Sequence, residues 1–240
     1  MFGTDRLPGL APGLVVDDES GWTPVTRLID GEGLPELLAA AAHRWDAQPH
    51  AAAALLWKSY SYYATLPVVL GWAAARRVPL LEPADVLVRA DADGPLVTIG
   101  LRRRARVAVL PSDPLALTGR ADVRVVRDDA ELLTLLRESL LDRHLNPLIE
   151  AIRGQVRLNA RTLLGSVSSA VAYGVLRAAG SLPGASVESV GTLLDALGLA
   201  ELIELVPGPS GEPTVQRKTC CLAFTLPKPK LCAGCCVRPS

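Results

Sequence analysis

Cysteine is missing from the first 219 of the 240 residues. All five cysteines lie in the last 21 residues, within the segment "KTCCLAFTLPKPKLCAGCCVRPS". Cysteines used for packing replace small apolar residues in helices or strands. Because these five lie instead in a segment rich in proline and lysine, we expect them to have a role other than packing.

The chain also lacks an excess of charge and a long apolar run. Its 25 basic residues balance 25 acidic residues, whereas a nucleic-acid binder is usually basic, so that class has no support. The most apolar stretch, residues 64–75, is interrupted by Pro67 and Gly71, and a membrane-spanning helix needs roughly 20 residues. The start "MFGTDRLPGLAPGL" lacks the pattern of a signal peptide. We therefore expect a cytoplasmic protein with no membrane span.

The periodicity of apolar residues predicts an α+β fold: a mostly helical body with a small antiparallel sheet. The helices are expected to begin at Pro35, at His50 with a break near Pro67, at Asp128, at Asn146-Pro147, at Asn159 and at Val187. Apolar and polar residues alternate in 85–110 around the turn "DADG", which predicts two strands. Shorter strands are expected at 13–17 and 121–128.

The composition also divides the chain. Residues 206–213, "VPGPSGEP", have the composition of a linker. They separate an α+β body, residues 1–205, from a cysteine-rich segment, residues 214–240. We expect the substrate to bind to the body and a metal centre to lie in the cysteine-rich segment.

The spacing of the cysteines indicates a metal centre. Cys220 and Cys221 are followed after ten residues by Cys232, and after two more by Cys235 with the adjoining Cys236. In a reducing compartment such clusters bind metal or act in catalysis rather than form disulfides. Two pairs supply four thiolates, enough for tetrahedral zinc or for a [2Fe–2S] cluster. Adjacent cysteines on an extended backbone point to opposite sides, which favours two irons but leaves zinc open.

Three stretches carry a resemblance to a known family. The pattern Cys-Cys-x10-Cys-x2-Cys is similar to the cluster motif of the FhuF-type ferric-siderophore reductases. The stretch "LLWKSYSYYATLPVVLGWAAARRVPL" looks like the Trp/Tyr-rich helical region of that family. The stretch "LLDRHLNPLIEAIRGQVRLNARTLLGSVSSAVAYGVLRAA" resembles its helix pair with an R-x-L-x-G-x-V turn. The likeness covers most of residues 50–240.

The resemblance implies a function and a set of ligands. Cys220, Cys221, Cys232 and Cys235 would bind a [2Fe–2S] cluster, while Cys236 lies outside the motif and is able to take the place of Cys235. The cluster would reduce a ferric siderophore by one electron and so release iron in the cytoplasm. Because no nucleotide-binding fingerprint is visible, the electrons would come from a protein such as a ferredoxin.

The charge of the last 30 residues is uneven. Residues 211–240 carry a net charge of +4, since Glu212 is the one acidic residue against five basic ones. Four of these, Arg217, Lys218, Lys228 and Lys230, would raise the potential of a nearby cluster or dock an acidic ferredoxin or an anionic chelate. Their alternative role is to keep the segment soluble.

Other candidate residues have two interpretations each. The aromatic residues between 57 and 72 either line a pocket for a bulky chelate or belong to the core; they are Trp57, Tyr60, Tyr62, Tyr63 and Trp72. His144 either contacts substrate or lies at a helix end as a cap or surface group. The basic cluster "LRRRARV" at 101–107 either faces an anionic ligand or protects an exposed edge strand.

Three functions therefore remain. The first is a siderophore-iron reductase with a [2Fe–2S] cluster. The second, from a different class, is a non-catalytic binding protein whose cysteine-rich segment holds a structural zinc ion. The third is an iron–sulfur regulator or carrier that binds the chelate without turning it over.

Overall fold

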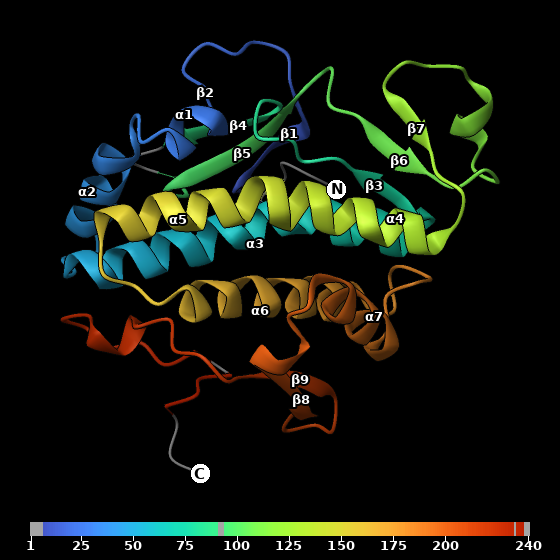
Figure 1. Ribbon diagram of the computed structural model, residues 1–240. Coiled ribbons are helices and arrows are strands. Elements are labelled where there is room, and N and C mark those ends of the chain that lie inside the picture. The colour runs from blue at the N-terminus through green and yellow to red at the C-terminus, as the bar shows by residue number, and fades with distance from the viewer. Residues whose placement is uncertain (1–6, 91–93, 233, 238–240) are drawn as a thin grey trace.

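The computed structural model describes residues 7–90, 94–232 and 234–237, and it has an α+β fold, as predicted. Its elements lie in layers, with two small sheets at the top of Figure 1 and the long helices α3 and α5 beneath them. Helices α6 and α7 form the next layer, and the cysteine-rich segment lies against the far side of α6. None of the described helices is long and apolar enough to cross a membrane.

The first sheet has the strand order β1-β5-β4-β2. Strands β4 and β5 are the predicted antiparallel pair, although residues 91–93 of the turn "DADG" lie outside the described residues. Strand β1 pairs with β5 in parallel. Several helices and strands separate the two in the chain, which supplies the long connection that a parallel pair needs. The strands are β1 (Leu10–Val16), β2 (Thr23–Pro24), β4 (Val86–Ala90) and β5 (Val97–Arg102).

The last predicted strand does not join this sheet. It forms a second sheet of order β3-β6-β7, in which β6 and β7 are parallel. The expectation of one antiparallel sheet is therefore wrong in detail, since the alternation of residues does not encode which strands become partners. The elements are β3 (Arg77–Pro79), β6 (Val107–Val109), the short turn of helix η1 (Pro114–Leu117) and β7 (Val123–Val125).

Helix α3 corrects a second prediction. It runs without interruption from Pro49 to Ala75 and contains Pro67, where we expected a break. A proline inside a helix costs about 3 kcal/mol, but 17 of the 27 residues of α3 are buried, and this packing outweighs the local cost. The helices before it are α1 (Val25–Ile29) and α2 (Leu34–Trp45), which has Pro35 in its first turn as predicted.

The expected helix start at Asn146-Pro147 is also not a break. Helix α4 (Asp129–Leu136) continues through a π-helical stretch, η2 (Arg137–Leu145), into α5 (Asn146–Gln155). Leu145 and Asn146 both keep right-handed helical dihedral angles. The wider π turn before Pro147 accommodates a residue that has no N–H to donate. The leucines at positions 132, 136, 140 and 141 of this continuous helix are buried.

The remaining helices match the sequence pattern. Helix α6 (Ala160–Ala178) is capped by Asn159, and α7 (Val187–Leu197) ends at Gly198 in the left-handed conformation. The short helices η3 (Ala200–Leu202) and η4 (Ala223–Thr225) follow. The predicted linker, 206–213, contains the ends of two paired strands, β8 (Ile203–Pro207) and β9 (Pro213–Arg217), and the turn between them. The division of the chain at this hairpin stays a prediction.

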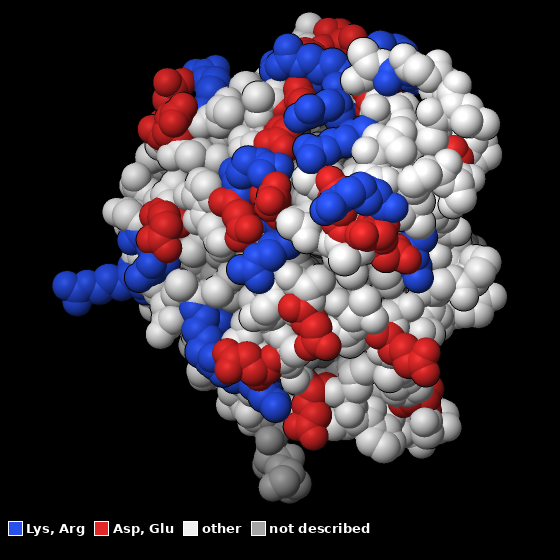
Figure 2. Space-filling model, turned by 45° about the vertical axis from the view of Figure 1, so that its right-hand side comes forward, with Lys and Arg blue, Asp and Glu red and all other residues white. Residues whose placement is uncertain are grey.

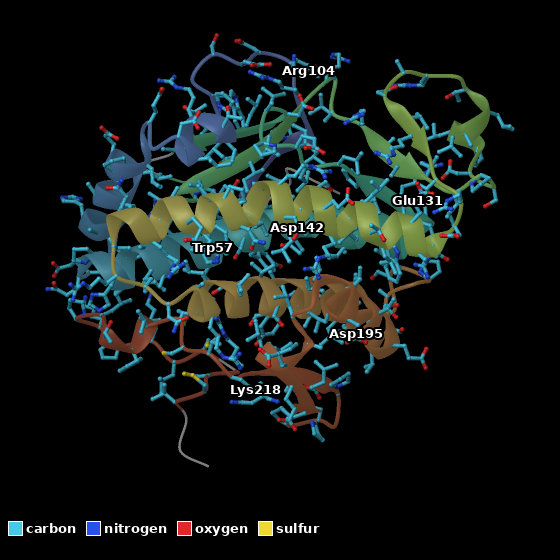
Figure 3. All side chains as sticks on the ribbon, in the orientation of Figure 1. Trp57, Arg104, Glu131, Asp142, Asp195 and Lys218 are labelled. Carbon is cyan, nitrogen blue, oxygen red and sulfur yellow. The ribbon has the colours of Figure 1, made fainter. Side chains whose placement is uncertain are left out.

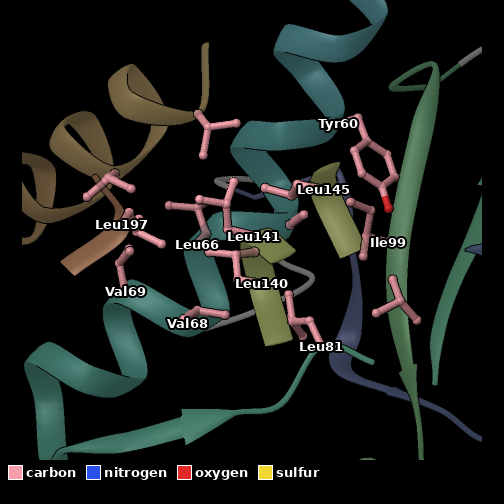
Figure 4. Packing of buried hydrophobic residues seen from close by; sticks show 14 of the residues in the cluster. Tyr60, Leu66, Val68, Val69, Leu81, Ile99, Leu140, Leu141, Leu145 and Leu197 are labelled. Carbon is pink, nitrogen blue, oxygen red and sulfur yellow. The ribbon is translucent and has the colours of Figure 1, made fainter. Parts of the chain in front are cut away.

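Helix α3 lies at the centre of the core, between the sheets and α6. Figure 4 shows Leu66, Val68 and Val69 of this helix packed beside leucines of η2. Tyr60 and His144 form a polar contact inside this apolar core, where the Tyr60 hydroxyl hydrogen-bonds the His144 Nε2. His144 has no exposed surface, so the interpretations of this residue as a substrate contact and as a cap or surface group are both wrong.

The burial of His144 predicts a pH dependence of stability. Burial lowers the pKa of His144 from 6.5 to about 3, so the folded protein keeps it neutral where the unfolded chain binds a proton. The free energy of unfolding should therefore fall as the pH drops from 6.5 towards 3, by up to about 1.4 kcal/mol per pH unit. Urea unfolding between pH 4 and 7 measures this slope.

The variant His144→Gln should lose this part of the slope, because glutamine does not titrate. His50→Gln is the control, since His50 is exposed and lies outside the buried contact between Tyr60 and His144. Equal slopes in the wild type and in His144→Gln would contradict the prediction.

Candidate functional site

Two glycines allow close packing of the cysteine-rich segment, Gly165 against the body and Gly234 within the segment itself. A Cβ atom on Gly165 of α6 would lie 2.8 Å from the Thr219 Cβ, and Thr219 directly precedes the first cysteine pair. A Cβ atom on Gly234 would lie 2.9 Å from the carbonyl carbon of Val215 in β9. Gly165 is the glycine of the R-x-L-x-G-x-V stretch, so its place in that pattern has a steric reason.

Hydrogen bonds fix the second cysteine turn next to the same strand. The Arg217 N–H donates to the Gly234 carbonyl at 3.0 Å, and the Gln216 side chain donates to the Cys235 carbonyl at 3.1 Å. The Cys235 N–H donates to the Cys232 carbonyl at 3.1 Å, which closes the Cys-x-x-Cys turn. Both cysteine pairs are thus positioned by α6 and β9.

The thiols meet across the segment as two pairs. The Cys232 thiol donates to Cys221, and the Cys236 thiol donates to Cys220, whose sulfur also accepts from the Leu222 N–H at 3.3 Å. Cys221 and Cys235 are buried, whereas Cys236 is exposed. In the part of the chain that the structure describes, no three cysteine, histidine or carboxylate side chains gather closely enough to hold one metal ion.

The surroundings favour a thiolate at Cys221. The hydrogen bond from Cys232 lowers the pKa of Cys221 to about 5, helped by the Ala223 N–H and by the positive charges of Lys58 and Arg217. The same hydrogen bond and burial raise the pKa of Cys232. A thiolate is the form that binds metal, so this pair is electrostatically prepared for a cation.

A cleft of about 420 Å³ opens beside this pair of thiols. Helix α3 provides one wall, α6 the other, and Arg217 and Cys232 close the end. Figure 3 shows the sulfur atoms below α6, at the edge of the layer that carries the cysteine-rich segment. The described lining residues are Leu55, Lys58, Ser59, Tyr62, Tyr63, Ser166, Ser169, Ala170, Tyr173, Arg177, Arg217 and Cys232.

The aromatic residues predicted to line a pocket divide into two groups. Tyr62 and Tyr63 line the cleft, whereas the other three are at most 3% exposed and belong to the core. Trp57 donates from Nε1 to the Leu163 carbonyl at 2.8 Å and so joins α3 to α6. The pocket interpretation therefore applies to two of the five residues, because one face of α3 meets the cleft while the others meet the core.

The predicted basic residues are also divided. Arg217 lines the cleft and is 3% exposed, while Lys228 and Lys230 are exposed and do not line it. Lys218 points to Glu204, with its Nζ 4.0 Å from the carboxylate. Arg238 lies outside the described residues.

Sequence reasoning missed much of the lining. Ser166, Ser169, Tyr173 and Arg177 follow one another at helical spacings of three and four residues on α6. Lys58 and Tyr62 are likewise four residues apart on α3. A polar stripe on an otherwise apolar helix was the available signal.

Three of the four arginines in the basic cluster at 101–107 are paired with carboxylates. Arg102 binds Glu19 with two nitrogens at 2.8 and 2.9 Å, Arg103 pairs with Asp17, and Arg104 pairs with Asp85 at 2.7 Å. Strand β5 lies between β1 and β4, so the expectation of a charged edge strand is wrong, while the interpretation as a cluster that faces an anionic ligand stays a prediction. Figure 2 shows basic and acidic side chains interspersed over the face in view.

The contact between Gly165 and Thr219 predicts a steric test of this packing. Gly165→Ala should displace Thr219 and lower the free energy of unfolding by about 1–3 kcal/mol. It should also let a thiol reagent reach the buried Cys221 faster in metal-free protein. Both effects can be measured by urea unfolding and by the rate of thiol modification.

Gly154→Ala on α5 is the matched control, because a Cβ there would meet nothing within 4 Å. It should stabilise the protein by about 0.5–1 kcal/mol through the better helix propensity of alanine. If Gly165→Ala were as harmless as this control, the close contact would not hold the segment in place.

Comparison with known proteins agrees with this fold. The chain resembles the aerobactin synthetase IucA from a hypervirulent pathotype of Klebsiella pneumoniae, with a TM-score of 0.52, 16% identity, and coverage of 82% of this chain and 37% of that chain. The ATP-bound form of IucA matches with a TM-score of 0.51 and 15% identity, and the match covers 82% of this chain and 36% of that chain. At this identity the likeness concerns the fold alone, and this chain spans little more than a third of IucA's length. No curated protein matches the chain.

The family comparison is more informative. The model described as ferric iron reductase FhuF-like transporter matches residues 54–195, which is more than half of the chain. The match runs from α3 into α7 and so includes both walls of the cleft, while the cysteine-rich segment lies beyond it. The chain belongs to the FhuF-like ferric iron reductase family.

Proposed function

We propose that this protein reduces the ferric iron of a siderophore to ferrous iron, with a [2Fe–2S] cluster bound by Cys220, Cys221, Cys232 and Cys235. One observation carries the proposal. In a chain of the FhuF-like family, the cleft between α3 and α6 has a cysteine of the predicted ligand set, Cys232, in its wall. A chelate bound in this cleft would lie next to the sulfur ligands.

The residues present fit such a cluster in their chemistry, since the segment supplies five thiols for four ligand positions. A [2Fe–2S] cluster takes four thiolates, two on each iron. The thiols meet as two pairs, Cys221 with Cys232 and Cys220 with Cys236. The contact of Cys236 with Cys220 keeps Cys236 as a competitor of Cys235 for the fourth position.

The cluster would supply a single electron to the ferric ion, and a reduced protein donor such as a ferredoxin would replace it. Ferric iron is a hard cation held tightly by the siderophore oxygens, and ferrous iron is held far more weakly. The residues of the cleft hold the chelate beside Cys232. Ferrous iron is then released because the siderophore oxygens hold it more weakly than ferric iron. Exposed Lys228 and Lys230 are suited to dock an acidic donor. We propose that this takes place in the cytoplasm.

The composition of the purified protein tests the proposal. Anaerobically purified full-length chain should be red-brown and contain about two iron atoms and two acid-labile sulfides. It should reduce a panel of ferric siderophores when a reduced ferredoxin is supplied. Colourless protein with a single zinc ion would support a non-catalytic binding protein with a structural zinc site instead.

Replacement of single cysteines identifies the ligands. Cys220→Ser, Cys221→Ser and Cys232→Ser should each abolish the visible spectrum or strongly reduce the iron content, because one iron loses a thiolate. Cys235→Ser should do the same and Cys236→Ser should do much less. If Cys236→Ser bleaches the protein while Cys235→Ser keeps its spectrum, Cys236 is the fourth ligand.

The buried charge of Arg217 should raise the reduction potential. A positive charge in the low-dielectric surroundings of the sulfurs stabilises the more negative, reduced state. Arg217→Gln should therefore lower the midpoint potential measured by redox titration, while Arg217→Lys should retain most of it. The neighbouring variant Lys218→Gln is the control, since Lys218 is exposed and its charge is screened by solvent. Equal potentials in Arg217→Gln and the wild type would show that this charge does not act on the cluster.

A further inference from the structure

The cleft is lined by positive charge without negative charge to balance it. Lys58, Arg177 and Arg217 are among its described lining residues, and none of the described lining residues is an aspartate or glutamate. Many arginines elsewhere on the surface are paired with carboxylates, as Arg102, Arg143 and Arg153 are.

Arg217 has donors that no described residue satisfies. Its Nη2 donates to the Ser166 hydroxyl at 3.0 Å, but Nε and the other Nη find no partner among the described residues. The side chain is 3% exposed. Leaving a buried guanidinium partly unpaired is costly, so an anion in the cleft would remove an existing penalty.

Two of the three cations that line the cleft also interact with the cysteine sulfurs. Lys58 and Arg217 both act on Cys221 and Cys232, so the thiolates compete for them. Arg177 is different. Its Nη1 donates to the Tyr62 hydroxyl at 2.8 Å, and its guanidinium lies 5.6 Å from the ring centres of Tyr62 and Tyr173. The two rings hold Arg177 at the wall of the cleft, and no carboxylate among the described residues pairs with it.

We infer that the cleft selects ferric chelates of net negative charge and that Arg177 is a residue that determines this specificity. The inference rests on the proposed function for the identity of the ligand as a chelate. The guanidinium donates to anionic oxygens of the chelate, such as the catecholate or carboxylate oxygens around the metal. Tyr62, Tyr63 and Tyr173 offer aromatic surface to a planar catecholate ring. The volume of about 420 Å³ is in the range of small-molecule sites.

Gallium(III) chelates test the inference without electron transfer, because gallium(III) takes the place of ferric iron but is not reduced. Isothermal titration calorimetry with the full chain would compare a trianionic gallium tris-catecholate with a neutral gallium tris-hydroxamate of similar size. We expect the anionic chelate to bind at least about tenfold more tightly. The difference should shrink as salt is added, because salt screens the attraction between exposed charges.

The variant Arg177→Gln should weaken binding of the anionic chelate by roughly five- to tenfold and change binding of the neutral one by less than about twofold. Arg177→Lys keeps the charge and should retain part of the selectivity. Arg161→Gln is the matched control on the same helix, because Arg161 is outside the cleft and paired with Glu201. It should leave both affinities unchanged.

The inference is overturned if the wild type binds the neutral chelate equally well, or if Arg177→Gln changes both affinities equally or neither. These outcomes are separate from a failure of the proposed function. Protein that lacks iron and sulfide but shows the gallium selectivity would refute the reductase and retain the anion-selective cleft. Protein that reduces ferric chelates with no preference for charge would support the reductase and refute the anion-selective cleft.

Discussion

The packing of α6 against α3 is the contact on which the rest of the structure depends. Gly174 brings the helices together, since a Cβ there would lie 3.0 Å from a methyl of Val69 and 3.1 Å from one of Leu66. The hydrogen bond from Trp57 to the Leu163 carbonyl fixes the position of one helix along the other. The apolar residues between the two helices form the core, and the polar residues at one border of the same contact line the cleft. Core and candidate site are thus two sides of one helix pair.

The cysteine-rich segment depends on the same helix in a different way. The Thr219 side chain packs against Gly165 of α6, and the Arg217 side chain donates to Ser166 of the same helix. Within the segment, Gly234 packs against β9 and its carbonyl accepts from the Arg217 N–H. These contacts bring Cys232 to the wall of the cleft. The body of the protein therefore helps to fix the position of the sulfurs, although many residues separate α6 from the cysteines in the sequence.

The sequence predicted the parts of the fold that follow from local periodicity. The starts of α6 and α7 and the pair β4–β5 are where the pattern placed them. It did not predict the uninterrupted helix through Pro67 or the continuous backbone at Asn146. At Pro67 the local rule for proline is overridden by burial against residues distant in the chain, and at Pro147 the wider π turn accommodates the proline. The parallel pairing of β1 with β5 was missed because partner choice is not a local property.

The thiols of the site could be predicted from the sequence, but its charged residues could not. Cysteines are rare, so their spacing stands out, and this spacing carried the resemblance to the family that residues 54–195 confirm. Lys58, Arg177 and Arg217 are three cations among 25 basic residues, on α3, α6 and β9. Only the fold shows that they face one space and that Arg217 is buried with unpaired donors. An isolated buried cation is unfavourable, and the fold keeps this one where thiolates approach it from one side and an open cleft from the other. Ionised sulfurs would offset the cost of burying Arg217, and an anion in the cleft would offset it further, which would couple the charge of the proposed metal centre to that of the ligand.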